Sequence, residues 1–250
     1  MSLPVHLVPS LGGVRAGDAV EVTGDEAHHA VAVRRLRVGE TVVLTDGRGT
    51  RVVGEVTETG KRVFVVTAES VESVPRPEPR VVVVQALPKG DRGELAVEML
   101  TEIGADRIVP WAAARSVAVW KGERAVKSHA RWVSTAREAA KQSRRAWLPE
   151  VDTLVGTESV ASLLAEADLA LVLHEDGTGS LGDLTVPESG TVVVVVGPEG
   201  GLSPEELEAF AAAGARVVRL GDEVLRTSTA GVAALAALLA HTPRWGPRTP

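Results

Sequence analysis

Two glycine-containing segments near the C-terminus hold the residues best suited to chemistry. The first, Gly197–Gly201 (GPEGG), directly follows five valines, and about twenty residues later Gly221 precedes the second, Leu225–Thr229 (LRTST). Glycines leave the backbone N–H and C=O groups accessible to a ligand. An arginine beside such a loop can stabilise negative charge that develops during a reaction. The two segments therefore indicate a ligand site that carries a cation, Arg226, and three hydroxyls.

The elements around these segments are expected to place them side by side. Val192–Val196 is typical of a parallel strand buried on both faces. Ser203, with Pro204 and Glu206 after it, predicts a capping box at the start of a helix over 204–213. Arg216–Leu220 then predicts a second strand, and a very apolar helix runs on through Leu239. Both loops thus follow the carboxyl ends of strands, where open α/β sheets bind their ligands.

The rest of the chain divides near a stiff linker, Pro75–Pro79. After the linker, strands and helices alternate, which predicts a parallel α/β sheet. The expected strands are Val81–Leu87, Arg107–Val109 and Leu169–His174, and the expected helices are Gly93–Ile103, Ala130–Gln142 and Ser159–Ala167.

Before the linker, short strands and one helix, Asp25–Leu36, favour a small barrel or sandwich. The expected strands there are Ala19–Thr23, Glu40–Thr45, Gly54–Thr57 and Val63–Ala68. We therefore expect two domains, residues 1–73 and 74–250.

Composition excludes several classes of function. The chain has no cysteine, so disulfides, thiolate chemistry and cysteine-bound zinc are excluded. The first ten residues lack the features of a signal peptide, and the apolar run Ala230–Ala240 is too short to cross a membrane. A cytoplasmic protein without a membrane partner is expected.

Charge is unevenly distributed. The net charge of −6 argues mildly against a nucleic-acid partner, but residues 115–145 hold nine Lys and Arg against two Glu. This local charge of +7 suits phosphate binding, and a solvated helix face explains it equally well.

The sequence VVGPEGGLS, followed by LGDEVLRTSTA, resembles the 16S ribosomal RNA uridine-N3 methyltransferases (small-subunit rRNA methyltransferase E), in the SPOUT class of knotted S-adenosylmethionine enzymes. Three further segments carry the resemblance: DEAHHAVAVRRLRVGE, LPKGDRGELAVEMLTEIGADRIVP and STAREAAKQSRRAWLPE. Two positions depart from the family pattern. Met99 replaces a common lysine, and Ser228 replaces a usual glutamate, so any role of that acid is absent or shifted here.

The resemblance implies a fold and partners. It implies a PUA-like RNA-binding β-barrel domain followed by a SPOUT-type parallel sheet with a C-terminal trefoil knot. It also implies a homodimer that acts on 16S rRNA or the small ribosomal subunit, with S-adenosylmethionine as cofactor and no metal.

The resemblance also implies roles for individual residues. Arg226 is the expected catalytic residue, stabilising charge on the uracil, with bracing of its loop as the alternative. The expected cofactor-binding residues are Leu173, His174, Glu175, Gly197, Pro198, Glu199, Gly200, Gly201, Leu220, Gly221, Val224, Leu225, Thr227, Thr229 and Ala230. The expected RNA-binding residues are Arg34, Arg35, Arg37, Lys89, Arg92, Gln142, Arg144 and Arg145. Simple surface charge is the alternative for Arg35, and helix-dipole compensation is the alternative for Arg144 and Arg145.

Two other functions stay open at this point. One is methylation of another RNA position, such as a ribose 2′-hydroxyl, and the other is RNA binding without catalysis. The sequence names neither the modified nucleotide nor a general base, and it does not distinguish naked rRNA from an assembled subunit.

Overall fold

The computed structural model describes residues 3–246, which form two compact units. The first consists of the chain up to Arg76 together with Ala140–Leu148, and the second consists of Pro77–Ala139 and the chain from Pro149 on. Each unit has its own hydrophobic core.

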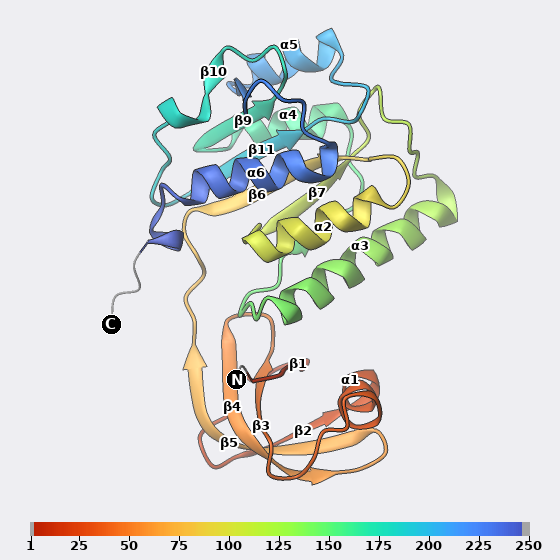
Figure 1. Ribbon diagram of the computed structural model, residues 1–250, viewed down its shortest axis with the longest axis vertical. Helices are drawn as coiled ribbons and strands as arrows, with labels where there is room; N and C mark the ends of the chain where they lie inside the picture. Colours follow the sequence, from red (N-terminus) through yellow and green to blue (C-terminus); the bar gives the residue numbers. More distant parts are fainter. Residues whose placement is uncertain (1–2, 247–250) are drawn as a thin grey trace. The chain divides into compact units, whose positions relative to one another are not determined.

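The first unit is built on one curled five-stranded sheet (Figure 1). The strand order is β1-β3-β4-β5-β2, in which β1 pairs parallel to β3 and the other pairs are antiparallel. Phe64 and the inward valines of these strands form a buried core with Ala27 and Ala30. The strands are β1 (Val5–Leu7), β2 (Ala19–Thr23), β3 (Thr41–Thr45), β4 (Thr50–Thr59) and β5 (Val63–Ser73).

The helix expected over Asp25–Leu36 is shorter than predicted. It consists of α1 (Gly24–His28) and a π-helical turn, η1 (His29–Val33). Arg35 has a positive φ of 57°, and the Leu36 N–H donates to the Ala30 carbonyl at 3.0 Å. This left-handed residue ends the helix, a geometry that glycine usually provides.

The segment Ala140–Leu148 completes the first unit from a distant part of the sequence. The Gly49 N–H donates to the Ala146 carbonyl (2.9 Å), and the Trp147 indole donates to the Val74 carbonyl (2.9 Å). The expected domains, 1–73 and 74–250, are each one continuous stretch, whereas this segment interrupts the second stretch.

The second unit contains a seven-stranded sheet in the order β10-β12-β9-β11-β6-β7-β8. All strand pairs of this sheet within residues 3–246 are parallel, as the alternating pattern predicts. The expected trefoil knot stays a prediction, because strand order alone does not specify how a chain threads. The strands are β6 (Arg80–Ala86), β7 (Arg107–Trp111), β8 (Glu150–Val151), β9 (Leu169–Leu173), β10 (Gly179–Ser180), β11 (Thr191–Val196) and β12 (Arg216–Arg219).

Helices cover both faces of this sheet (Figure 1). Val192 and Val194 of β11 pack with α2, α3 and α6, while Val193 and Val195 pack with α4 and α5. The valine run is therefore buried on both faces, as predicted. The helices are α2 (Arg92–Ile103), α3 (Gly122–Gln142), α4 (Thr157–Ala165), α5 (Pro204–Ala212) and α6 (Thr227–Leu239), with short turns η2 (Leu181–Asp183) and η3 (Pro243–Trp245).

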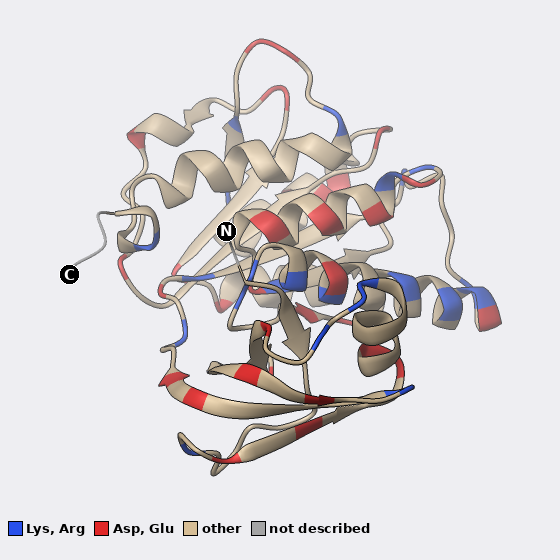
Figure 2. Ribbon diagram, turned by 60° about the horizontal axis from the view of Figure 1, so that its bottom comes forward, with Lys and Arg blue, Asp and Glu red and all other residues tan. Residues whose placement is uncertain are grey.

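Helix α3 begins eight residues before the predicted start at Ala130. Its first turns carry Arg124, Val126 and Lys127, and Val126 is 69 % exposed. The apolar periodicity that marks a helix is weak there because these turns face solvent. Figure 2 shows that basic residues recur along α3.

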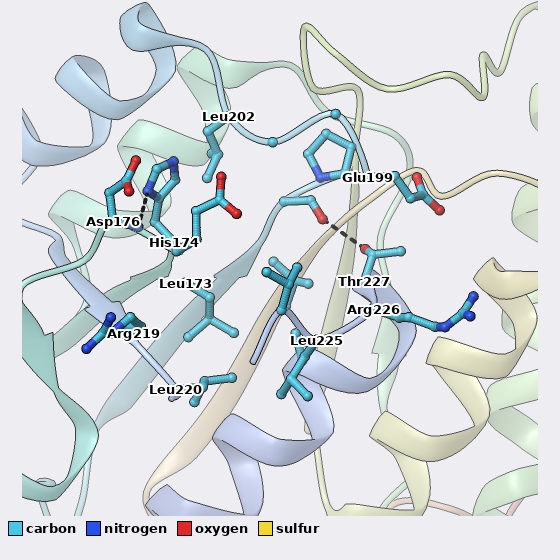
Figure 3. A pocket seen from close by; sticks show the side chains of 18 of the residues that line it. Leu173, His174, Asp176, Glu199, Leu202, Arg219, Leu220, Leu225, Arg226 and Thr227 are labelled. Carbon is cyan, nitrogen blue, oxygen red and sulfur yellow. Dashed lines mark hydrogen bonds between the residues drawn. The ribbon is translucent and has the colours of Figure 1, made fainter. Parts of the chain in front are cut away.

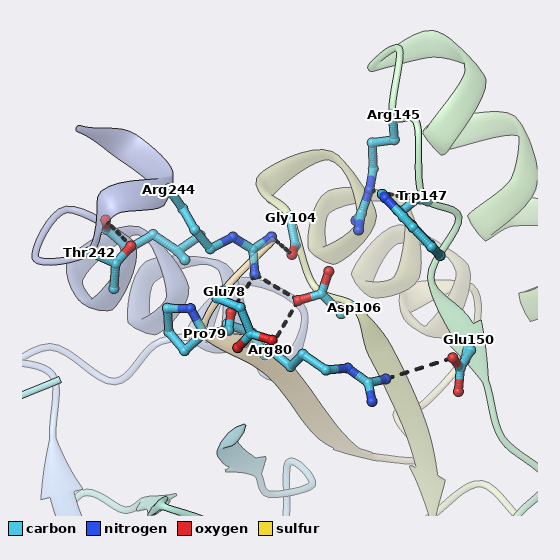
Figure 4. Close-up of polar contacts among 12 residues, drawn as sticks. Glu78, Pro79, Arg80, Gly104, Asp106, Arg145, Trp147, Glu150, Thr242 and Arg244 are labelled. Atoms are coloured by element: carbon cyan, nitrogen blue, oxygen red, sulfur yellow. Dashed lines mark hydrogen bonds and ion pairs between the residues drawn. The ribbon is translucent and has the colours of Figure 1, made fainter. Parts of the chain in front are cut away.

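A buried ion pair anchors the end of the described chain. The Arg244 guanidinium donates to Asp106 (2.6 Å) and to the Gly104 carbonyl (2.7 Å), as Figure 4 shows. Asp106 also accepts from the Val81 N–H at 2.9 Å. The segment after α6 is thereby fixed to the start of β6 and to the residues that precede β7.

Candidate functional site

The capping box predicted at Ser203 positions the glycine loop. The Ser203 hydroxyl accepts from the Glu206 N–H, and the Glu206 carboxylate accepts from the Ser203 N–H. Glu206 is buried and also accepts from the Ala114 N–H at 2.7 Å. The start of α5 is therefore held both to its own cap and to the segment after β7.

A cavity of about 900 Å³ opens at the carboxyl ends of β9, β11 and β12 (Figure 3). Three loops enclose it: residues 173–176, 196–202 and 218–227. The two segments that the sequence singled out therefore meet in one pocket. They follow β11 and β12, two parallel strands on either side of β9, and the carboxyl ends of all three strands lie at the same edge of the sheet.

One side of the pocket is apolar. Leu173, Leu220 and Leu225 gather there, as Figure 3 shows. Leu225 is 40 % exposed and Val224 is 79 % exposed, so apolar surface is left uncovered at the cavity. An exposed apolar wall inside a cavity suits the apolar part of a ligand.

The two glycines that end the GPEGG loop are required for different reasons. Gly201 has φ +71°, a conformation that L side chains rarely adopt, and its N–H donates to the Pro198 carbonyl at 3.0 Å. A Cβ on Gly200 would lie 3.0 Å from both Cβ and O of Arg115. Close packing against the protein itself therefore restricts position 200.

Acidic and imidazole groups line the pocket on the loop after β9 and on the GPEGG loop. His174 Nδ1 accepts from the Asp176 N–H at 3.1 Å, which fixes the ring against its own loop. Glu175 is exposed at the cavity. Glu199 Oε1 accepts from the Lys89 N–H at 3.2 Å and so joins the GPEGG loop to the loop after β6.

Five cations among the described residues line the pocket. Arg219 is paired with Asp222, and the other four are Lys89, Arg92, Arg115 and Arg226. Arg226 is the N-cap residue of α6 and is exposed. Figure 3 shows its side chain extending away from Leu173 and Leu220, on the side where Glu199 lies. The pocket thus has an apolar wall and a cationic side.

The pocket contains nearly all of the predicted cofactor residues, but not Thr229. Its hydroxyl donates to the Arg226 carbonyl at 3.1 Å within the first turn of α6. Thr229 is not among the residues that line the cavity in which the cofactor is expected to bind.

Several pocket residues were missed by sequence reasoning. Arg115 lies in the basic segment already noted, and its Nη1 donates to the Gly200 carbonyl at 3.4 Å. Arg219 and Asp222 form an ion pair at 3.4 Å at the end of β12. Their proximity to the predicted loops was the available signal. The missed residues are Arg115, Val117, Asp176, Val196, Leu202, Pro204, Leu207, Val218, Arg219, Asp222 and Glu223.

The remaining predicted RNA-binding residues lie in the first unit: Arg34, Arg35, Arg37, Gln142, Arg144 and Arg145. Arg144 shares with Arg35 a φ of +57°, and both side chains are exposed. The Arg145 N–H donates to the Ala140 carbonyl, and its Nε donates to the Trp147 carbonyl at 3.0 Å. Backbone hydrogen bonds therefore cap this end of α3.

A buried charge network joins the segment Ala140–Leu148 to the sheet of the first unit. Glu26 contacts His6 Nδ1 at 3.3 Å and Lys141 Nζ at 3.0 Å. Burial alone would raise the pKa of Glu26, but the hydrogen bonds and charges of His6 and Lys141 outweigh it and lower that pKa from 4.5 to about 2.

Within residues 3–246, no group of His, Cys, Asp and Glu side chains is placed to hold a metal ion. No helix in the same range has the length and apolar character needed to cross a membrane.

Comparison with known proteins assigns the chain to a family. Residues 75–239 match the family model of an RNA methyltransferase domain, and residues 22–68 match that of an RNA methyltransferase PUA domain. The chain belongs to the RNA methyltransferase family. The expected fold, a small PUA domain before an α/β methyltransferase domain with a parallel sheet, is confirmed.

Several relatives match this RNA methyltransferase over most of its length. The chain is 45 % identical over 245 residues to ribosomal RNA small subunit methyltransferase E of Mycobacterium bovis, covering 96 % of this chain and 92 % of the relative. It is 30 % identical to the enzyme of that name from Bacillus subtilis, with 88 % and 90 % covered. The structure of ribosomal RNA small subunit methyltransferase E from Neisseria gonorrhoeae, bound to S-adenosylmethionine, is similar to it with a TM-score of 0.85 at 28 % identity, covering 96 % and 98 %.

Proposed function

We propose that this RNA methyltransferase transfers a methyl group from S-adenosylmethionine to N3 of a uridine in 16S rRNA of the small ribosomal subunit. The observation that carries the proposal is the pocket in which the GPEGG and LRT loops meet. It lies in a chain that is similar over most of its length to proteins named ribosomal RNA small subunit methyltransferase E. With ribosomal RNA as substrate, the cytoplasm is the proposed location.

The pocket fits this cofactor in size and chemistry. Its volume of about 900 Å³ lies within the range of small-molecule sites and leaves room for a nucleotide beside the cofactor. The uncovered apolar wall at Val224 and Leu225 suits a purine ring, and Glu175 suits the hydroxyls of a ribose. The backbone of Gly197–Gly201 supplies polar groups without intervening side chains.

The chemistry requires an activated methyl group and a nitrogen nucleophile. S-adenosylmethionine, when bound, supplies a methyl group on a positively charged sulfur. Uracil N3 carries a proton, and the negative charge left by its removal spreads onto O2 and O4. Arg226 is proposed to stabilise that charge, because it lies on the cationic side of the pocket without an ion pair among the described residues.

The other pocket residues serve orientation. The loops hold both reactants in one cavity, and such positioning removes a large entropic part of the barrier. Lys89 and Arg92 line the cationic side, where the phosphates that flank a bound nucleotide are expected. No side chain in the pocket is proposed as a general base.

The first unit is proposed to bind the rRNA. The exposed Arg34, Arg35, Arg37 and Arg144 offer positive charge to phosphates. Gln142 and Arg145, at the end of α3, belong to the same unit. Phosphate contacts of this kind position an RNA, while the pocket selects the base.

A homodimer is proposed from the surface of α6. Val232, Ala233, Ala236 and Ala237 of this helix are half-buried and recur at spacings of one helical turn. They form a stripe of small apolar side chains that a second copy can cover.

Nucleoside analysis tests the proposed reaction. Rescue of a methyltransferase-deficient strain with this gene should restore 3-methyluridine in digested 16S rRNA, as measured by mass spectrometry. Restoration of a 2′-O-methyl nucleoside instead would assign a different RNA position. Failure of the purified protein to bind S-adenosylmethionine at millimolar concentration in calorimetry would leave only RNA binding.

A further inference from the structure

Gln85, near the end of β6, is a fully buried polar residue. The other buried residues of this strand are Val and Ala. A buried amide costs stability unless it is hydrogen-bonded. Its Nε2 donates to the Ala86 carbonyl (3.1 Å) and to the Thr227 hydroxyl (2.9 Å), while Oε1 has no partner among the described residues. A hydrophobic residue would suit this position better if packing were its only role.

The orientation of these hydrogen bonds is determined. The Ala86 carbonyl can only accept, so the amide nitrogen of Gln85 faces it and Thr227. The Thr227 hydroxyl then accepts from Gln85 and uses its single proton to donate to the Gly197 carbonyl at 2.9 Å. Figure 3 shows the last of these bonds. The result is a directed chain from Gln85 through Thr227 to Gly197.

This chain joins the two loops that enclose the pocket. Gly197 begins the GPEGG loop, and Thr227 is the first residue of α6, directly after Arg226. Gln85 lies beside Val196 in the sheet register, at the point where β11 ends. A single buried side chain on β6 thus connects the start of one loop to the end of the other.

The packing of α6 supports the same point. A Cβ on Gly231 would lie 3.0 Å from Leu100 and 3.2 Å from Val196, so the helix lies close against the sheet one turn after Thr227. The hydrogen bonds of Gln85 hold the N-terminus of α6, where Arg226 is located, in place.

We infer that Gln85 is a positioning residue: through Thr227 it sets the GPEGG loop and Arg226 in the geometry that binds the cofactor and stabilises the reacting base. The inference rests on the proposed function for its catalytic part. It also revises the expected role of Thr227, whose proton is engaged by Gly197 and which acts on the pocket through the loop.

Size-matched variants test the inference. In Gln85→Met and Thr227→Val, affinity for S-adenosylmethionine in calorimetry without RNA should fall about tenfold, and single-turnover methylation at saturating RNA and cofactor should slow between about tenfold and a hundredfold. Thr227→Ser keeps the hydroxyl and should regain most of the affinity and rate that Thr227→Val loses. The double variant should lose no more affinity or rate than the worse single variant, because both substitutions break the same chain of hydrogen bonds.

The matched control is Thr242→Val. Thr242 is also buried, and its hydroxyl donates to the Leu239 carbonyl at 2.9 Å just after the opposite end of α6. This variant should lower the melting temperature and leave cofactor affinity and methylation rate unchanged. If Gln85→Met loses thermal stability as the control does but keeps wild-type affinity and rate, Gln85 is structural only and the inference is wrong.

Two further outcomes are decisive. If the losses of the two single variants multiply in the double variant, Gln85 and Thr227 act independently and the chain is refuted. If Gln85→Met does not fold, Thr227→Val compared with Thr227→Ser tests the chain at its middle residue, and equal cofactor affinity in the two refutes it. Absence of rRNA methylation by the wild type overturns the proposed function, while the calorimetric comparison still decides the role of Gln85.

Discussion

Arg226 and Arg35 represent two uses of an arginine, one at the pocket of the second unit and one on the surface of the first unit. Arg226 extends along the cationic side of the cavity, where its charge is available to a reacting base (Figure 3). Arg35 occupies a left-handed backbone position that glycine would adopt without strain. The proposed function predicts a different defect for each.

Replacement of Arg226 should affect the chemical step. Arg226→Ala is expected to slow single-turnover methylation on the order of a hundredfold, as for the loss of one charge-stabilising donor, with RNA binding nearly intact. The defect should persist at saturating RNA, because the interaction strengthens in the transition state. Arg216→Ala, an exposed arginine of β12 outside the pocket, serves as control. A wild-type rate for Arg226→Ala would identify Arg226 as a brace of its loop.

Replacement of Arg35 should separate stability from RNA binding. Arg35→Gly relieves a strained backbone and is expected to stabilise the protein by about 1 kcal/mol in urea unfolding. The same variant should weaken RNA binding and reduce its salt slope by about one, with cofactor affinity unchanged. Arg35→Ala should weaken RNA binding equally without the gain in stability. Unchanged RNA binding in both variants would show that Arg35 is ordinary surface charge.

At the scale of elements, the GPEGG loop depends on the strand before it and the helix after it. The buried valines of β11 and the capping box of α5 fix both ends of the loop, and the turn between them requires the positive φ of Gly201. The loop is therefore rigidly supported and accepts little change within the turn.

A Cβ at position 201 should damage the cofactor site more than the fold. That Cβ would lie 4.0 Å from Arg115 Nη1, with no nearer contact among the described residues apart from its chain neighbours, so backbone strain and contact with the ligand are its expected effects. Gly201→Val should reduce affinity for S-adenosylmethionine at least tenfold, about 1.4 kcal/mol, with an unchanged circular dichroism spectrum. Gly214→Ala introduces a side chain at a similar φ of +88° with open space around it, just after α5. Equal affinities for S-adenosylmethionine in the two variants would show that Gly201 is not part of the cofactor site.

At the scale of the whole molecule, the chain passes from one compact unit to the other and back. Residues 140–148 belong to the first unit although they lie between elements of the second. The ion pair between Lys141 and Glu26 is one of the contacts that hold this segment, so the first unit depends on charge as well as on its core.

Acid should therefore weaken the first unit. The pKa of Glu26 is lowered from 4.5 to about 2 in the folded protein, so its contribution to stability is present above about pH 4.5 and is lost as the pH falls towards 2. Hydrogen exchange of first-unit amides should accelerate over this range in the wild type. Glu26→Gln should be less stable at pH 7 and show a smaller change with acid. An equal acid response in both proteins would show that other carboxylates control it.

Sequence patterns determined those parts of this protein that depend on neighbours in the chain. The valine run, the capping box of Ser203 and Glu206, and the strand–helix alternation are local signals, and each predicted its element. They also predicted that the two glycine loops meet, because the ends of parallel strands share one edge of the sheet.

Only the tertiary structure decided the contacts between distant residues. The hydrogen bond from Gln85 to Thr227 spans 142 positions. Nothing in VVVVQA distinguishes a functional glutamine from one that only marks the end of a strand. The packing of Arg115 on Gly200 and the place of Ala140–Leu148 in the first unit are of the same kind. Such contacts form because the packed sheets bring these segments together, and no periodicity within a segment encodes its partner.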